Sequence, residues 1–253
     1  MTEKVKIFNI RIQNISKSDL LENLSEGVFI TPNVDHLVKL QKDHEFYEVY
    51  QNADWIVCDS KIVAIGLKLL GTPIKDVIPG SSFFTKYYLY HKDNENVKIF
   101  LLGAAEGVAE KAMKKINEKV GRNIVVGAHS PSFGFEKNET ECEEIIHLIN
   151  ETDANVLLVG VGAPKQEKWI HKHKNQFTNV KLFMGLGATI DFEAGNIKRA
   201  PKIFQKLALE WFYRMCIDPK RLVKRYLVDD MSFFYYLVKQ KFGKYTNPFQ
   251  EKI

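Results

Sequence analysis

Asp59 is the residue whose type and position point most directly to chemistry in this sequence. It follows the apolar run of residues 55–58, and Ser60 and a helical pattern come directly after it. A carboxylate at the tip of a buried strand can act as a general base on a substrate hydroxyl. No second carboxylate stands near it in sequence to form a glycosidase-type pair, and no convincing Ser/His/Asp or Cys/His order is present. Asp59 is therefore our best candidate for a catalytic group.

Other apolar segments also end in polar or glycine-containing stretches. These ends are Thr31-Pro32-Asn33, Gly103-Ala104-Ala105, Ala163-Pro164-Lys165-Gln166-Glu167 and Ala188-Thr189-Ile190-Asp191. Each polar residue alone can be explained as a helix N-cap, because Thr, Asn, Asp and Ser open helices. Five such ends that face one crevice are harder to explain by capping alone. The sequence therefore predicts a polar site at these ends.

Glycines supply a way to bind an anion there. The glycines that stand at these ends are Gly103, Gly160, Gly162, Gly185 and Gly187. They let the backbone approach a ligand and direct amide N–H groups at it, and a helix N-terminus after such a loop favours a phosphate. Neither a G-x-G-x-x-G fingerprint nor a P-loop occurs, so a nucleotide diphosphate is favoured over a dinucleotide. The loop residues expected to contact it are Gly103, Gly162, Lys165 and Asp191.

Short apolar strands alternate with helices from Lys4 to about Asp191. The strand segments are KVKIFNIRI, GVFITPN, ADWIVCD, VKIFLLG, RNIVVGA, NVLLVGVG and VKLFMGLG, and helices include residues 34–51, 60–70, 105–120 and 139–151. Continuous apolar strands indicate a sheet covered on both faces, and the alternation indicates parallel βαβ units. The expected fold class is α/β, with a Rossmann-like, mostly parallel sheet and helices on both faces. Ligands bind at the carboxyl ends of such strands.

The alternation stops after about Gly195, and the predicted domains are residues 1–195 and residues 196–253. Residues 196–253 contain 13 Lys/Arg and 5 Asp/Glu, and helical apolar stripes recur over residues 200–216 and 219–241. Such a basic helical appendage suits an anionic partner, although a merely solvated basic face is the alternative. The aromatic stretch MSFFYYL admits core packing or contact with a membrane surface. No motif for nucleic-acid binding is visible, so we expect no nucleic-acid partner.

The composition places the chain among globular proteins of a reducing compartment. It has 253 residues and 3 widely separated cysteines, and neither a signal peptide nor a transmembrane run of apolar residues is evident. No Cys/His spacing suggests a metal site, so we expect no metal and no cofactor. His171 and His173 stand two residues apart on a predicted helix, and we expect both at the surface.

Several motifs together resemble the WecG/TagA/CpsF family of bacterial glycosyltransferases. They are Thr31-Pro32-Asn33, Ala53-Asp54 leading to Asp59, VGVGAPKQEKWI and RAPKIFQKLALEWFYRMCIDPKRLVKRYL. The likeness covers about residues 29–227, and the GAPKQE and RAPK segments are highly specific. The resemblance implies an inverting, metal-independent transfer of an N-acetylhexosamine of the N-acetylmannosamine type from a UDP-sugar. The implied acceptor is a sugar on undecaprenyl diphosphate, used in polysaccharide or teichoic acid synthesis.

The resemblance also implies roles for particular residues. Asp59 corresponds to the general base of the family, and Thr31 and Asn33 to a polar pair lining the pocket. Gln166 corresponds to the glutamine of the PKQE turn, which would present its amide to the sugar or phosphate. The arginines implied to reach the diphosphate when the appendage caps the site are Arg214, Arg221 and Arg225. Members are peripheral proteins on the cytoplasmic face of the membrane. The sequence is also compatible with a homo-oligomer.

Two positions depart from the family pattern. Val77 stands where an arginine is usual, and Ser82 stands where an aspartate is usual. These departures suit a different acceptor, a shifted role for Lys75 or reduced activity. They support one alternative, a catalytically impaired relative that binds UDP-sugar or lipid. A second alternative, which does not depend on them, is a Rossmann-type oxidoreductase. The second would need a dinucleotide fingerprint, which the sequence lacks.

Overall fold

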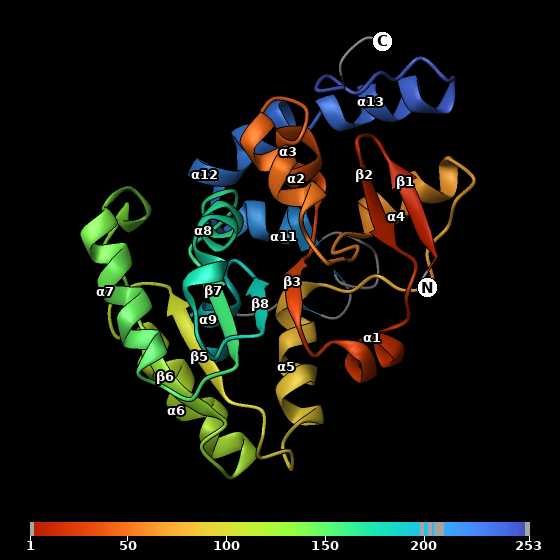
Figure 1. Cartoon of the computed structure of the whole chain (residues 1–253). Coiled ribbons are helices and arrows are strands. Elements are labelled where there is room, and N and C mark those ends of the chain that lie inside the picture. The colour runs from red at the N-terminus through yellow and green to blue at the C-terminus, as the bar shows by residue number, and fades with distance from the viewer. Residues whose placement is uncertain (1–2, 198–199, 202–203, 205–209, 251–253) are drawn as a thin grey trace.

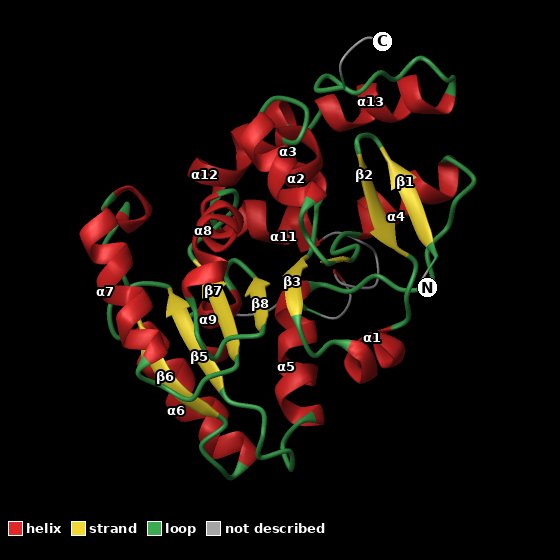
Figure 2. Ribbon diagram, in the orientation of Figure 1, coloured by secondary structure: helices red, strands yellow, loops and turns green. Residues whose placement is uncertain are grey.

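A six-stranded parallel sheet forms the centre of the protein (Figures 1 and 2). The computed structural model describes residues 3–197, 200–201, 204 and 210–250, without the side chains of residues 210, 211, 214 and 221. The sheet order is β4-β3-β8-β7-β5-β6. The strands are β3 (Gly27–Ile30), β4 (Trp55–Ile56), β5 (Ile99–Gly103), β6 (Val125–His129), β7 (Val156–Gly160) and β8 (Leu182–Gly185). The predicted α/β fold class is confirmed.

Helices cover both faces of the sheet because its central strands are apolar on both sides. In β5, Phe100 and Leu102 join one buried cluster, while Ile99 and Leu101 join the other. The first face packs against α2 (Val34–Lys39), α3 (His44–Gln51), α7 (Glu139–Asn150) and α8 (Lys165–His173). The second packs against α1 (Lys17–Asn23), α5 (Gly80–Tyr90), α6 (Val108–Val120) and α9 (Thr189–Ala194). Each large apolar side chain buried in this way contributes about 1.5–3 kcal/mol of transfer free energy.

The first predicted strand does not belong to the parallel sheet, so that expectation is wrong. KVKIFNIRI folds back on itself as an antiparallel hairpin of β1 (Lys4–Ile7) and β2 (Ile10–Gln13), which forms a separate sheet. The exposed residues of these two strands are Lys4, Lys6 and Arg11, and they alternate with buried residues. This alternation is typical of a strand with one solvent-exposed face. Phe8 makes the turn with a φ of 52°. The Lys/Arg alternation indicates a solvent-exposed face but does not mark the turn at Phe8.

The predicted helices are found with two differences. Residues 34–51 form two helices rather than one, because Asp43 caps the start of α3 by accepting a hydrogen bond from Phe46 N at 3.0 Å. Helix α5 was not expected from the sequence. Helix α4 (Lys61–Leu69), α6 and α7 lie within the predicted ranges.

The described part of the C-terminal region is helical. It contains α11 (Glu210–Ile217), α12 (Pro219–Lys224), the π-helical turn η3 (Arg225–Asp229) and α13 (Ser232–Lys241). Helix α13 lies beside the β1–β2 hairpin (Figure 1), where Phe8 contacts Phe233 with ring centroids 5.5 Å apart and Gln240 Oε1 accepts from Phe8 N at 2.7 Å. Part of the helix predicted over residues 200–216 falls outside the described residues. The division into two domains at residue 195 stays a prediction.

Candidate functional site

The predicted strand ends meet along one edge of the sheet, here called the carboxyl edge. Because all six strands are parallel, the segments after β4, β3, β8, β7 and β5 leave the sheet at this edge in that spatial order. They carry Asp59, Thr31, Gly187, Gly162 and Gly103. Open α/β sheets bind ligands at this edge. The candidate site therefore lies here.

Asp59 and Thr31 are brought together by the first residue of helix α5. Asp59 Oδ1 accepts a hydrogen bond from Gly80 N at 2.8 Å. A Cβ atom at Gly80 would lie 2.9 Å from Thr31 Oγ1 and 2.5 Å from Leu186 Cδ2, so a larger residue would force these side chains to shift. The amino end of α5 carries partial positive charge, which faces the Asp59 carboxylate. Sequence reasoning missed this contact because Gly80 belongs to the helix that it did not predict.

Asn33 caps the helix that follows β3. Its Oδ1 accepts from His36 N at 3.2 Å at the start of α2, as expected of an N-cap. Thr31, two residues earlier, is buried. Thr31, Asn33 and Asp59 thus stand at the ends of the neighbouring strands β3 and β4. A role for Asn33 in binding a ligand stays a prediction.

Gln166 stabilises the turn that leads from β7 into α8. Its Oε1 accepts from Gly162 N at 3.1 Å, and its Nε2 donates to Glu167 Oε1 at 2.7 Å. The side chain is only 2% exposed, so in this structure its amide points into the protein rather than towards solvent. The Gly162 backbone, with a φ of +88°, adopts a conformation that favours glycine. The role of Gln166 supported by these contacts is to hold the Gly162 turn in shape.

Lys165 and Asp191 lie at the same edge in different surroundings. Lys165 Nζ forms an ion pair with Glu136 Oε1 at 3.0 Å and lies 4.6 Å from the ring centroid of the fully exposed Phe133. Asp191 lies in the first turn of α9, where burial raises the pKa of its carboxyl. Contacts of either residue with a ligand stay predictions.

The ends of β5 and β7 approach each other closely at the carboxyl edge. A Cβ atom on Gly103, whose φ is +137°, would lie 2.5 Å from Gly160 O. The chain leaves β5 towards β6 but leaves β7 towards β8, so the connections diverge at this point. Such a divergence is where nucleotides bind in doubly wound sheets. Ser130 Oγ secures the loop after Gly103 by donating to Ala105 O at 2.9 Å.

Arg225 brings the C-terminal region to this edge. Its Nη2 lies 3.1 Å from Asp35 Oδ2 in α2, and its Nε lies 3.9 Å from Asp230 Oδ2. Burial raises the pKa of Asp230 to about 6. The side chains of Arg214 and Arg221 are outside the described part of the chain, so their predicted roles are untested.

Two ionisable groups beneath the carboxyl edge are fully buried and were not singled out from the sequence. Desolvation raises the pKa of Glu167 to about 7, and its Oε2 has no hydrogen-bond partner among the described residues. Desolvation lowers the pKa of His36 to about 3, and its Nδ1 lies 2.7 Å from Tyr50 Oη. His173 is also buried, against Trp169, which corrects the expectation of a surface position. The only local signal for burial was the apolar spacing around these residues.

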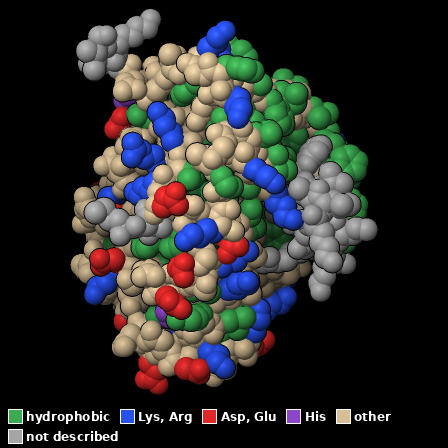
Figure 3. All heavy atoms as spheres, turned by 90° about the vertical axis from the view of Figure 1, so that its right-hand side faces the viewer, with side chains coloured by type: hydrophobic (Ala, Val, Ile, Leu, Met, Phe, Trp, Pro, Cys, Tyr) green, Lys and Arg blue, Asp and Glu red, His purple; other side chains and the backbone are tan. Residues whose placement is uncertain are grey.

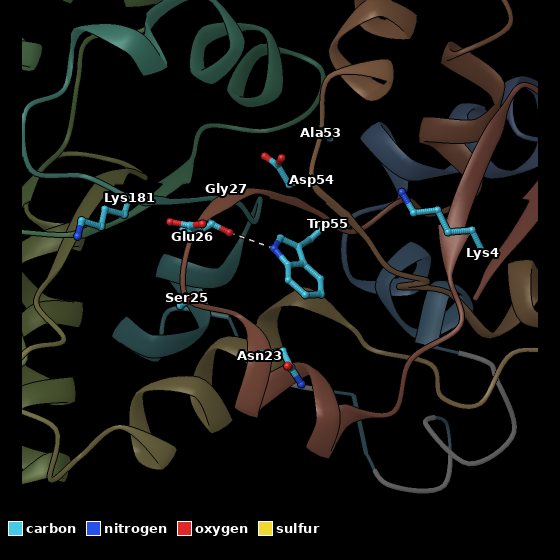
Figure 4. Close-up of a pocket in the computed structure, with 9 residues that line it drawn as sticks. All are labelled: Lys4, Asn23, Ser25, Glu26, Gly27, Ala53, Asp54, Trp55 and Lys181. Carbon is cyan, nitrogen blue, oxygen red and sulfur yellow. Dashed lines mark hydrogen bonds between the residues drawn. The ribbon is translucent and has the colours of Figure 1, made fainter. Parts of the chain in front are cut away.

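Two open hollows lie at the opposite, amino edge of the sheet. The larger, of about 700 Å³, is lined by Lys4, Asn23, Ser25, Glu26, Gly27, Ala53, Asp54, Trp55 and Lys181 (Figure 4). In it the Trp55 indole donates to Glu26 O at 3.0 Å. This hollow holds none of the predicted site residues. Among the described residues, no cluster of His, Cys, Asp and Glu could hold a metal ion. In the same part of the chain, none of the helices combines the length and the apolar character that a membrane span requires.

Comparisons with known proteins agree with the motifs. The model of the glycosyl transferase WecG/TagA/CpsF family matches residues 5–247. An N-acetylglucosaminyldiphosphoundecaprenol N-acetyl-beta-D-mannosaminyltransferase of Staphylococcus aureus (strain MRSA252) is 32% identical over 249 residues, covering 95% of this chain and 94% of the relative. The protein of that name in strain NCTC 8325 / PS 47 is 31% identical over the same shares. The resemblance predicted from the sequence is confirmed, and the chain belongs to the WecG/TagA/CpsF family of glycosyltransferases.

Proposed function

We propose that this glycosyltransferase moves an N-acetylhexosamine of the N-acetylmannosamine type from a UDP-sugar to a sugar on a polyprenyl diphosphate, for cell-surface polysaccharide or teichoic acid synthesis. The names of its relatives support both the sugar and the lipid-linked acceptor. The observation that carries the proposal is the placement of Asp59 and Thr31 around Gly80 at the carboxyl edge. In this proposal the Asp59 carboxylate takes the proton of the bound acceptor hydroxyl.

The proposed reaction is a single displacement. Asp59 accepts the proton of the acceptor hydroxyl, whose oxygen forms a bond to the anomeric carbon of the donor. The bond from that carbon to the diphosphate breaks on the opposite side, and UDP leaves with the electron pair. One displacement inverts the anomeric centre. The sequence shows no Asp-x-Asp metal motif, so the negative charge on UDP is countered by Arg225 and by backbone N–H groups near Gly103 and Gly162.

Calorimetry tests the donor class first. We expect the purified chain to bind UDP with an affinity that is unchanged by Mg²⁺ or by EDTA, because arginine and amide groups rather than a metal hold the diphosphate. NAD is the matched ligand, since it carries a diphosphate but needs a dinucleotide site. Binding of NAD without binding of UDP would refute the transferase proposal and favour the oxidoreductase.

An impaired relative is the second candidate, because Ser82 lies close to the proposed base. It stands in the first turn of α5, two residues after Gly80, and its hydroxyl donates to Pro79 O at 3.0 Å. A serine there supplies no carboxylate to the site. UDP binding without any UDP release in the presence of donor and lipid-linked acceptor would support this candidate.

We further propose that an apolar surface on the C-terminal helices and α4 rests on the cytoplasmic face of the membrane. Figure 3 shows hydrophobic side chains gathered, beside Lys and Arg, on the side of the molecule that carries α13 and α4. The exposed large apolar residues of α4 and of the segment from α12 to the C-cap residue of α13 are Ile65, Leu69, Val223, Leu227, Val228, Met231, Phe234, Tyr235, Val238 and Phe242. An apolar face with basic neighbours suits an anionic lipid surface.

Vesicle binding tests this surface. Replacing Val238 and Phe242, which are 56% and 72% exposed, with serine is expected to weaken binding to anionic vesicles roughly tenfold or more, because both side chains lose their burial in lipid. The exposed Leu148 on α7 provides the control substitution, Leu148→Ser. Equal vesicle binding by the double variant and the parent chain would refute the membrane proposal. In that case, a shift from dimer to monomer would show that the surface joins two copies.

A further inference from the structure

One buried carboxylate links three segments of the candidate site. Asp35 lies in the first turn of α2, two residues after Asn33, and its side chain is 10% exposed. Its Oδ2 accepts from Lys39 Nζ at 2.8 Å and lies 3.1 Å from Arg225 Nη2. Lys39 Nζ also donates to Ala163 O at 3.2 Å. Asp35 thus connects α2 to the loop after β7 and to the C-terminal turn η3.

Two cations flank the Asp35 carboxylate. Lys39 and Arg225 share a single oxygen of one carboxylate. The other acidic neighbour of Arg225 is Asp230, which lies farther away at 3.9 Å and whose pKa burial raises to about 6. Arg225 Nε is buried and has no hydrogen-bond partner among the described residues. The Arg225 side chain is nevertheless 29% exposed, so part of it stays open to a further anion.

An arginine side chain is long and flexible, and its place must be set by its neighbours. Holding the guanidinium in one place removes the rotational freedom of such a side chain, which costs entropy. When a neighbouring carboxylate holds the guanidinium in advance, that cost is not incurred while charge develops on the leaving group. Tyr226 lies 5.7 Å from the guanidinium carbon and adds a weaker contact. Among the contacts of Arg225 with described residues, the ion pair with Asp35 is the shortest that reaches the body of the protein.

We propose that Asp35 is a positioning residue for sugar transfer: its carboxylate, held by Lys39, keeps the Arg225 guanidinium at the carboxyl edge, ready to counter the diphosphate charge. This inference rests on the proposed function, because it gives Arg225 a leaving group to act on. Asp35 itself contacts no reacting atom in this scheme. Its effect on the reaction passes through Arg225.

A double-mutant cycle of Asp35→Asn and Arg225→Ala tests the inference through kcat and KM for UDP release. Asp35→Asn is expected to lower kcat roughly tenfold to hundredfold with a smaller change in donor KM, because a misplaced guanidinium fails mainly in the transition state. In the Arg225→Ala background, the same substitution is expected to change kcat by less than about twofold. Asp35→Glu, which keeps the charge, is expected to recover part of the loss.

The control is Asp43→Asn, which removes a carboxylate that pairs with Lys168 at 2.8 Å and caps α3 away from Arg225. It is expected to lower the melting temperature but to keep kcat. Equal losses of kcat on Asp35→Asn with and without Arg225 would overturn the inference, as would an unchanged kcat in the single variant. A parent chain that transfers no sugar would instead overturn the proposed function, and this inference with it.

Discussion

Asp59→Asn is expected to lower the rate of UDP release in the presence of donor and lipid-linked acceptor by roughly a hundredfold to ten-thousandfold, which is the usual contribution of a general base. In the parent chain, Asp59 Oδ1 accepts from Gly80 N at 2.8 Å. Asparagine has nearly the same size and keeps an oxygen that can accept this hydrogen bond. The substitution removes the group that takes the proton of the acceptor hydroxyl. UDP binding measured by calorimetry is therefore expected to persist while turnover is lost.

The control for this prediction is Asp153→Asn, at the amino edge of the sheet. Asp153 is an exposed carboxylate paired with Lys98, and it stands just before β7. Its replacement is expected to leave turnover within about twofold, as for surface positions in general. An Asp59→Asn variant that turns over at the parental rate would remove Asp59 from its proposed role. Loss of UDP binding in the same variant would show that Asp59 acts in donor binding.

Gly103→Ala is expected to cost roughly 3–5 kcal/mol of the free energy of unfolding. Two causes add up, because alanine is strained at a φ of +137° and its Cβ would lie 2.5 Å from Gly160 O. The atom in the way belongs to the backbone of the neighbouring strand, so it cannot move aside as a flexible side chain would. The measurement is urea unfolding followed by circular dichroism, with the unfolding free energy extrapolated to water.

Gly107→Ala separates the two causes in the same loop. Gly107 has a φ of +73°, but nothing lies within 4 Å of a Cβ atom placed there. Its replacement is therefore expected to cost only the left-handed backbone strain, about 1–2 kcal/mol. If both variants lost the same free energy, the close contact between Gly103 and Gly160 would have no energetic weight. The predicted steric cost of a Cβ atom between the ends of β5 and β7 would then be wrong.

The first prediction tests a residue of the proposed reaction, and the second tests a residue of the fold. Asp59 is proposed to act on the acceptor, whereas Gly103 lets two strand ends approach closely beside the proposed diphosphate. Gly80 belongs to both classes, since its N–H holds the Asp59 carboxylate and its missing side chain leaves room for Thr31. The amino end of α5 is thus part of the candidate site even though it supplies no reactive side chain.

The sequence by itself determined the fold class and the edge of the sheet that holds the site. Apolar runs such as VLLVG in β7 are buried on both faces of the sheet. Consecutive apolar residues are the local signal for such a strand. A parallel sheet places all carboxyl ends together, so the sequence alone groups Asp59 with Thr31. Local motifs such as GAPKQE also indicated the family. The hairpin of β1 and β2 escaped prediction because its apolar content resembles that of a parallel strand over so short a span.

Only the tertiary structure decided which groups meet. The strand order, with β8 between β3 and β7, depends on the path of long connections that no local pattern encodes. The same holds for the pair of Asp35 and Arg225, which are far apart in the chain, and for Gly80 beside Asp59. Gln166 had the right residue type for a ligand contact, yet its amide bonds to Gly162 and Glu167 because the folded turn buries it. Periodicity reports how a residue faces its own element, whereas burial and pairing depend on the elements that pack against it.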